Sequence, residues 1–425
     1  MLLVKDLREN PDKIKEALKK RCNDDLLNYV DQAISIDQTR RETQGQLDET
    51  LAQQKKISQE IGLLMRDGKK DEAEKVKARV SELKNQAQEL KLKLSEAEND
   101  LQNTLYQIPN TPHQSVAKGK SEDDNETVKE SGSIPKLADG AVPHWELAEK
   151  YNLIDFELGV KITGAGFPVY RGKGARLQRA LINFFLDEAQ DAGYNEVIPP
   201  LIVNEDSGYG TGQLPDKEGQ MYHIQNENFY LIPTAEVPIT NIYRDEILQS
   251  KQLPIKTCGY TPCFRREAGS YGKDVRGLNR LHQFDKVEIV QIVHPDNSYK
   301  ILDQMVEHVK NLLEKLELPY RILRLCGGDL GFAAAVTYDF EVYSTAQQKW
   351  LEVSSVSNFE TYQSNRLKCR FRGDDDKATT LVHTLNGSAL ALPRIMAAIL
   401  ENNQTENGIN IPKILHNYTN FVKID

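Results

Sequence analysis

A heptad repeat between residues 73 and 101 constrains the fold of this 425-residue chain more than any other feature. Its apolar positions are spaced three and four residues apart without a slip, which gives a narrow apolar seam along one long helix. They are Ala73, Val76, Val80, Leu83, Ala87, Leu90, Leu94, Ala97 and Leu101. The repeat predicts a coiled-coil helix.

A second helix is expected upstream, in a similar phase. Its apolar steps are Leu47, Leu51, Ile61 and Met65, with Gln54 and Ser58 as weaker steps. Only residues 66–70 separate the two patterns, and Gly68 supplies the turn. Two long helices with so short a link must run antiparallel. At about 35 residues each they would reach about 50 Å, so we expect a coiled-coil arm over about residues 29–105.

The charge balance limits how this chain can meet a nucleic acid. Its 54 Lys and Arg against 63 Asp and Glu give a net charge of -9, so no global basic field attracts a polyanion. Residues 52–70 nevertheless hold five bases and two acids. This locally basic stretch suits either a solvated coiled-coil face or a local contact with a polyanion.

Composition predicts three parts: a helical domain over residues 1–110, a linker over 111–135 and a second domain over 136–425. The linker is polar and acidic, and after it short strand-like runs alternate with helices. The chain start lacks the apolar region of an export signal, and no apolar run is long enough to span a bilayer. The five cysteines form no C-x-x-C pair, so no zinc is expected.

Residues 260–267 and 283–293 predict a hairpin that carries charged side chains on one of its faces. Period two places Arg265 and Glu267 on one face of the first strand, and Lys286 and Glu288 beside apolar residues on one face of the second. Charges are seldom buried without partners, so this face predicts a binding site. The loop between the strands is rich in glycine, with Gly269, Gly272 and Gly277. The common phosphate-binding glycine loops are missing from the sequence, so charged side chains would have to hold any nucleotide.

Two further segments join this constellation. Residues 350–355 predict a strand that carries an acid and hydroxyls, and residues 383–388 lead into an apolar helix that contains Arg394. Ser388 on its own favours a capping role at this strand-to-helix junction.

Together these segments resemble the class II aminoacyl-tRNA synthetases, and most closely the bacterial-type seryl-tRNA synthetases. The resemblance rests on the helix and strand that end near Pro200, which look like motif 1 of this class, on residues 264–284 (motif 2) and on residues 386–394 (motif 3). It rests also on the segments 211–215 and 234–236 and on the arm. It implies an α+β fold with an antiparallel catalytic sheet flanked by helices, a cytoplasmic homodimer, and ATP with Mg²⁺. It also implies that serine is activated to seryl-adenylate and transferred to tRNA(Ser), which the arm binds, and to tRNA(Sec) where this exists.

The same resemblance nominates site residues. The ATP-binding set is Arg265, Arg266, Glu267, Phe284, Glu352, Val353, Ser354, Ser355 and Arg394. Within it Arg265, Glu352 and Arg394 are implied to be catalytic, and Glu352 and Ser355 to hold Mg²⁺. The serine-binding set is Thr234, Ala235, Glu236, Glu288, Asn386 and Ser388.

Two departures from regular geometry are expected in these motifs. Strand period places residues 352 and 355 on opposite faces, so a bulge or a strand end is needed between them. Motif 3 usually has glycines where this chain has Ala389 and Pro393. Proline costs about 3 kcal/mol inside a helix unless it falls in the first turn, so a late helix start or a kink beside Arg394 is expected.

Two alternatives compete with a seryl-tRNA synthetase. An adenylate-forming relative that charges another carrier would lack the long arm, which this chain has. A catalytically silent coiled-coil interaction protein would have lost the ATP-contacting charges, but Arg265, Glu267, Glu352 and Arg394 are all present.

Overall fold

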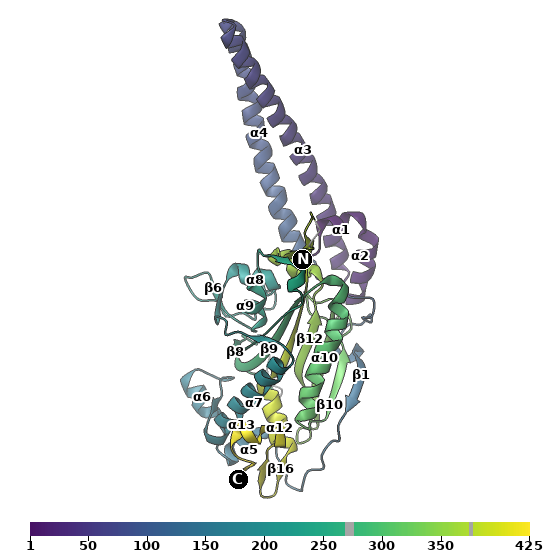
Figure 1. Cartoon of the computed structure of the whole chain (residues 1–425), viewed down its shortest axis with the longest axis vertical. Coiled ribbons are helices and arrows are strands. Elements are labelled where there is room, and N and C mark those ends of the chain that lie inside the picture. The colour runs from purple at the N-terminus through teal and green to yellow at the C-terminus, as the bar shows by residue number, and fades with distance from the viewer. Residues whose placement is uncertain (268–275, 374–376) are drawn as a thin grey trace. The chain divides into compact units, whose positions relative to one another are not determined.

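The structure is a computed structural model that describes residues 1–267, 276–373 and 377–425. The chain divides into two compact units (Figure 1). The helical unit comprises Leu2–Lys19 and Asn23–Pro109, and the larger unit comprises Met1, Lys20–Cys22 and Asn110–Asp425. Gly269 and Gly272 of the predicted glycine-rich loop lie outside the described residues. None of the described helices is both long and apolar enough to cross a membrane.

The helical unit is built around an antiparallel pair of long helices. Its helices are α1 (Val4–Glu9), α2 (Pro11–Leu18), α3 (Asp25–Arg66) and α4 (Lys70–Leu105). The α3–α4 turn is closed by the Lys69 N–H, which donates to the Leu64 carbonyl at 3.0 Å, and Gly68 takes the left-handed φ of 78° that the turn needs. The predicted antiparallel coiled coil is confirmed.

The apolar seam matches the prediction on α4 but not on α3. Leu83, Ala87 and Leu90 of α4 are buried, as expected. On α3, however, Leu51 is 38% exposed, whereas Thr50 is only 5% exposed. The predicted phase is therefore wrong by one residue at this step, and it is wrong again at Met65, which is 47% exposed. The partner helix selects the phase, and Thr50 tolerates burial because its hydroxyl donates to the Gln46 carbonyl at 2.7 Å.

The larger unit contains a mixed sheet that is antiparallel except at one edge. In the described residues its strands follow the order β1-β10-β11-β12-β15-β9-β8-β4, and only the pairing of β4 with β8 is parallel. The strands are β1 (Glu126–Ser131), β4 (Asn195–Glu196), β8 (Ile255–Phe264), β9 (Gln283–Val293), β10 (Tyr320–Arg324), β11 (Val336–Ser344), β12 (Lys349–Asn358) and β15 (His383–Ala391). This sheet confirms the α+β class and the antiparallel catalytic sheet.

Both edges of the sheet are formed by short segments for which the sequence makes a prediction. Strand β4 lies at one edge, where Pro199 and Pro200, which follow it, cannot interrupt a ladder. Strand β1 forms the other edge and falls inside the segment that composition predicts to be a linker. Its residues are exposed or half-buried, so backbone pairing with β10 orders a stretch that has little apolar surface to bury.

Three helices pack on the central strands and form the core with them (Figure 1). They are α7 (Gly172–Asp191), α10 (Ser298–Lys315) and α12 (Leu392–Asn402). Strand β9 shows how the sheet separates core from site: Val287 and Ile289 belong to this core, whereas Lys286 lies on the wall of a large cavity. Alternation along the strand therefore places charge on the face opposite the core helices.

Shorter elements complete the larger unit. The helices are α5 (His144–Lys150), α6 (Phe156–Ile162), α8 (Glu205–Thr211), α9 (Glu236–Asn241), α11 (Thr361–Leu367) and α13 (His416–Thr419). The strands of the small sheets are β2 (Ile154–Asp155), β3 (Val169–Tyr170), β5 (Ile202–Asn204), β6 (Phe229–Leu231), β7 (Ile247–Gln249), β13 (Arg370–Arg372), β14 (Thr380–Leu381), β16 (Gln404–Thr405), β17 (Gly408–Asn410) and β18 (Lys423–Ile424).

Two local expectations need correction. The strand predicted over residues 260–267 is β8, which ends at Phe264, where its ladder with β9 also ends. Arg265 and Glu267 thus lie beyond the strand, and Glu267 has a positive φ of 47°. Ser388 is not a helix cap, because β15 continues to Ala391 before α12 begins.

The expected late helix start in motif 3 is confirmed. Helix α12 begins at Leu392, so Pro393 falls in its first turn, where no intrahelical N–H is needed. Arg394 follows at once and points from the first turn of a regular helix rather than from a kink.

Candidate active site

A cavity of about 1130 Å³ lies in the larger unit, on the sheet face that carries Lys286. Most of the predicted site residues line it: Thr234, Glu236, Arg265, Glu267, Phe284, Glu352, Val353, Ser354, Ser355, Asn386, Ser388 and Arg394. They come from three sheet strands, β9, β12 and β15, and from segments outside the strands, so the fold gathers residues that are up to 160 positions apart in sequence, from 234 to 394.

The remaining predicted residues are all described and lie off the cavity wall. Ala235 is buried in an apolar cluster with Ile239 and Val290. Arg266 is exposed, and its backbone N–H donates to the Gln220 carbonyl at 2.9 Å. Glu288 is fully buried beneath residues that do line the cavity.

Glu288 is the centre of a buried polar cluster under the cavity. Its Oε2 accepts from the Lys286 ammonium at 2.6 Å and from the Thr234 hydroxyl at 3.1 Å. Its Oε1 accepts from the Asn386 amide at 3.2 Å. Burial raises the pKa of Glu288, while the ion pair and hydrogen bond with Lys286 act to lower it. One buried anion therefore fixes three side chains of the cavity wall.

The backbone register explains why a charge can sit there. Glu288 lies between Gly259 of β8 and Ser388 of β15, both of which are small. A side chain at residue 259 would meet the Val197 carbonyl oxygen at 2.7 Å, so this position has room for no more than glycine. Neither neighbouring strand therefore places a bulky side chain at the position paired with Glu288.

A second carboxylate, Glu236, lines the cavity at the start of α9. Its Oε1 accepts from the Gln363 amide at 2.7 Å, and the Thr384 hydroxyl donates to Gln363 Oε1 at 2.7 Å. Burial, and then the charge of Glu288, raise the pKa of Glu236 to about 7. Near neutral pH this pocket can accept a small cationic group such as an ammonium.

Sequence reasoning missed Gln363 as a member of the site. Gln363 lies on α11, more than a hundred residues after Glu236, and no local motif surrounds it. Lys286 was noticed as a strand charge but was not assigned to the site. Its spacing of two residues from Glu288 was a usable signal, because two residues in one strand share a face.

The cavity wall also carries two arginines, Arg265 and Arg394, and the Phe284 ring, which together we call the arginine side. The Arg265 guanidinium lies 5.3 Å from the Phe284 ring centroid, and its Nε donates to the Pro233 carbonyl at 3.3 Å. Arg394 donates from Nη1 to the Glu352 carbonyl at 2.7 Å. Arginine forks suit phosphate oxygens and an aromatic face suits a planar base, so this side can take a nucleotide.

Glu267 is not a free acid on the cavity wall, because it forms an ion pair. Its Oε2 forms an ion pair with the Arg280 Nε at 2.9 Å. The pair joins the two ends of the loop whose middle, residues 268–275, lies outside the described residues. Glu267 is therefore held on the cavity wall by the segment in which the loop returns to β9.

The bulge expected between residues 352 and 355 is confirmed. Strand β12 pairs Ser354 with Phe340 but Glu352 with Glu341, so Val353 is the extra residue. The bulge lets Glu352 and Ser355 both line the cavity. The Ser354 hydroxyl, in contrast, donates to the Ser388 carbonyl at 2.6 Å.

Hard oxygen ligands meet on this bulged strand. The Ser355 hydroxyl donates to Asp339, a residue that sequence reasoning missed, and burial and then the charge of Glu352 raise the pKa of Asp339. Among the described residues no three His, Cys, Asp or Glu side chains gather as a metal-binding set. Mg²⁺ is commonly held by one or two carboxylates together with substrate phosphates, and Glu352 with Ser355 fits that chemistry.

Comparisons with known proteins identify both parts of the chain. A family model described as the seryl-tRNA synthetase N-terminal domain matches residues 1–112. Another, described as the tRNA synthetase class II core domain (G, H, P, S and T), matches residues 221–403. The serine–tRNA ligase of Salinibacter ruber is 52% identical and that of Prosthecochloris aestuarii 44% identical, each over 100% of this chain and 99% of the relative.

Solved structures agree with the sequence matches. The seryl-tRNA synthetase of Pyrococcus horikoshii complexed with ATP has a TM-score of 0.93 and 34% identity, over 100% of this chain and 99% of that one. The cytoplasmic serine–tRNA ligase of Naegleria fowleri in complex with AMP has a TM-score of 0.88 and 26% identity, with the same coverage of each chain.

The ion pair under the cavity generates a prediction about stability. Lys286→Met should lower the free energy of unfolding by about 3 kcal/mol at neutral pH, because it leaves the buried Glu288 charge without its cation. The pKa of Glu288 is raised in the folded state, so its protonation favours folding. As the pH falls, Glu288 becomes neutral and no longer needs a cation, so the stability lost in the Lys286→Met variant should become smaller. Urea unfolding at neutral and acidic pH measures both effects.

The control for this prediction removes the charge as well as its partner. Glu288→Gln in the Lys286→Met background should recover much of the lost stability, because no unpaired charge stays buried. A loss that is the same at both pH values, or that the second substitution does not relieve, would contradict the electrostatic explanation.

Proposed function

The chain belongs to the seryl-tRNA synthetase family, and on that premise we propose that it joins serine to tRNA(Ser) with ATP as the second substrate. The serine carboxylate attacks the α-phosphate of ATP to give seryl-adenylate and pyrophosphate. The 3′-terminal ribose hydroxyl of the tRNA then attacks the seryl carbonyl and AMP leaves. The observation that carries this proposal is a single cavity whose wall holds the buried carboxylate Glu236 together with Arg265, Arg394 and the Phe284 ring.

The carboxylate side suits serine. Glu236 lies on the wall, and its charge would attract the serine ammonium. Thr234 and Asn386 also line the cavity, and their side chains donate hydrogen bonds to the buried Glu288. We assign Glu288 to fixing these groups and to the negative charge of the pocket. The pocket then has oriented polar atoms for a substrate hydroxyl, which alanine could not satisfy.

The arginine side suits ATP. Attack on the α-phosphate builds negative charge, and Arg265 would neutralise it with its planar fork. Phe284 and the aliphatic part of Arg394 would hold the adenine, while the Arg394 guanidinium would meet the γ-phosphate. Glu352 and Ser355 would hold Mg²⁺, which supplies charge neutralisation on the phosphates when bound.

The arm suits tRNA. Its outer part, residues 52–70, holds five bases and two acids, and Lys55, Lys56 and Lys70 are exposed. A long helical hairpin with a few clustered bases offers phosphate contacts and shape recognition rather than base readout. Because residues 106–425 hold most of the chain's acidic excess, they offer no general basic surface that could replace the arm.

We also infer a homodimer in the cytoplasm. Apolar side chains near the sheet edge are exposed in the single chain, Ile198 at 88% and Ile202 at 46%. Exposed apolar residues of this kind mark association surfaces when they cluster, and these two lie near each other in the sequence around Pro200, where the motif 1 helix and strand end. The cytoplasm follows from the proposed substrates, ATP and tRNA.

Substitution of Arg265 tests the adenylation chemistry. Arg265→Ala should reduce serine-dependent exchange of pyrophosphate into ATP by at least about 10²-fold, because a transition-state donor is lost. Arg265→Lys keeps the charge but not the planar fork, so its exchange rate should fall between those of the alanine variant and the wild type. Circular dichroism should show that both variants are folded. An alanine variant within about tenfold of the wild-type rate would refute the role of Arg265.

Shortening the arm tests the tRNA assignment. Leu47 of α3 and Leu90 of α4 belong to one buried cluster, so removing residues 48–89 and joining the helices by a short turn leaves the base of the arm paired. The shortened protein should retain serine-dependent pyrophosphate exchange and lose aminoacylation of tRNA(Ser). Binding of tRNA(Ser) to the intact protein should weaken as salt rises. If the shortened protein aminoacylated tRNA(Ser) at the wild-type rate, the arm would not be the tRNA contact.

A further inference from the structure

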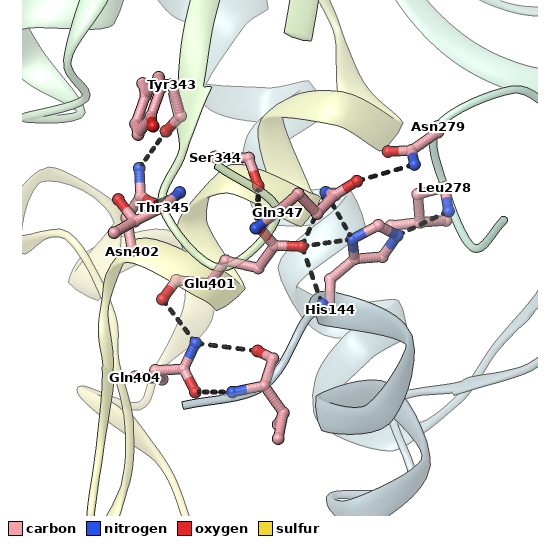
Figure 2. Close-up of polar contacts among 11 residues, drawn as sticks. His144, Leu278, Asn279, Tyr343, Ser344, Thr345, Gln347, Glu401, Asn402 and Gln404 are labelled. Atoms are coloured by element: carbon pink, nitrogen blue, oxygen red, sulfur yellow. Dashed lines mark hydrogen bonds and ion pairs between the residues drawn. The ribbon is translucent and has the colours of Figure 1, made fainter. Parts of the chain in front are cut away.

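A network of hydrogen bonds joins four separate elements of the larger unit (Figure 2). Its side chains are His144 at the start of α5, Glu401 near the end of α12, Gln347 in the turn between β11 and β12, and Asn279 just before β9. The proposed chemistry uses none of these side chains.

The centre of the network is a buried carboxylate. Glu401 Oε1 accepts from the His144 backbone N–H at 2.9 Å, from His144 Nδ1 at 2.6 Å and from Gln347 Nε2 at 2.9 Å. Glu401 Oε2 accepts from the Ser344 hydroxyl. The His144 and Glu401 side chains are both fully buried. A buried carboxylate with four donors is a rigid anchor, because any movement would leave a polar group unpaired.

The network ends on two neighbouring residues of motif 2. The Leu278 backbone N–H donates to His144 Nε2 at 2.8 Å, which fixes the histidine proton on Nδ1, toward Glu401. The Asn279 amide donates to Gln347 Oε1 at 2.9 Å. The bonds therefore form a closed ring from Leu278 through His144, Glu401 and Gln347 back to Asn279 (Figure 2).

The segment before Leu278 is fitted to the same histidine. Gly277 has a φ of 67°, and a side chain there would lie 2.3 Å from His144 Nε2. The Arg276 guanidinium lies 4.8 Å from the ring centroid of Trp145, the residue after His144. Residues 276–279 are thus seated on the first turn of α5, where the motif 2 loop returns to the sheet.

The anchored segment in turn holds Arg394. The Asn279 carbonyl accepts from Arg394 Nε at 2.9 Å, while Arg394 Nη1 donates to the Glu352 carbonyl. Leu278, Asn279 and Arg394 all line the cavity. The network therefore determines where the guanidinium of Arg394 and the wall residues of motif 2 stand.

We propose that His144, Glu401, Gln347 and Asn279 are positioning residues for ATP. They hold the motif 2 segment and, through the Asn279 carbonyl, Arg394 in the arrangement that binds the nucleotide. The inference rests on the proposed function, because it takes the arginine side of the cavity as the ATP site. A network that served only to join α5 to α12 would affect stability without a preference for either substrate.

Gln347→Ala is the most direct test, because Gln347 is half-buried in a turn and its loss leaves the His144–Glu401 pair intact. The KM for ATP in serine-dependent pyrophosphate exchange should rise about five- to tenfold, as expected for the loss of hydrogen bonds that orient a site. The KM for serine should stay within about twofold. Calorimetric titration with ATP alone should show a matching rise in Kd.

Gln348→Ala is the matched control. It removes the same atoms one residue further along the same turn, from an exposed side chain. Its KM for ATP and its Tm should equal those of the wild type. Equal KM values for ATP in the Gln347→Ala and Gln348→Ala variants would overturn the inference and leave the proposed function standing. A wild-type protein without serine-dependent exchange would overturn both.

Two substitutions of His144 separate positioning from packing. In His144→Gln the side-chain oxygen can reach the place of Nε2 and accept from Leu278, but the donor to Glu401 is lost. In His144→Asn the amide can take the place of Nδ1 and donate to Glu401, but Leu278 loses its acceptor. If His144 positions the motif 2 segment, the KM for ATP should rise more in the asparagine variant than in the glutamine variant. A KM for ATP that instead follows Tm across the two variants would indicate packing alone and contradict the inference.

Discussion

The structure of the larger unit depends on one buried carboxylate, that of Glu288. It lies on β9, inside the sheet, and all of its polar partners are within hydrogen-bonding distance. An ion pair with Lys286 and hydrogen bonds from Thr234 and Asn386 make this burial tolerable. The same bonds fix the wall of the pocket, because each partner lines the cavity. The proposed serine pocket therefore couples stability to recognition, because the groups that neutralise the buried charge are those that would face serine.

On the arginine side, which we propose to bind ATP, the side chains are positioned by backbone geometry rather than by one buried charge. A bulge at Val353 turns Glu352 and Ser355 to one face, and the first turn of α12, with Pro393 in it, presents Arg394. Strand β9 then joins the two sides, since Phe284 and Lys286 line the same cavity two residues apart. A single strand thus carries one contact for the proposed adenine and the base of the proposed serine pocket.

Much of this arrangement could be predicted from the sequence. The heptad repeat predicted the helical hairpin, and the motifs predicted residues most of which line the cavity, because their residue types and order are specific. The phase of α3 was not predictable, since Leu47 and Ile61 fit either of two seams and only the partner helix decides between Thr50 and Leu51. The end of β8 at Phe264 was also hidden, because it is set by where the pairing with β9 stops, at Gln283, and not by a local residue pattern.

Contacts between distant segments explain the remaining omissions. Gln363 meets Glu236 across 127 positions, and His144 meets Glu401 across 257. No local pattern around either residue indicates such a partner, because a single histidine or glutamine on a helix is compatible with many surroundings. Asp339 was missed for a related reason: it reaches Ser355 only through the register of β11 with β12.

The central claim is that the polar wall over Glu288 selects serine. Pyrophosphate exchange measured with each of the twenty amino acids tests it most directly. Serine should support exchange, and alanine should be slower by roughly 10⁴-fold in kcat/KM, because it would leave the hydrogen-bonding groups of the pocket unpaired. Exchange with alanine within about tenfold of that with serine would contradict the account, since a pocket that reads the hydroxyl cannot accept its absence so easily.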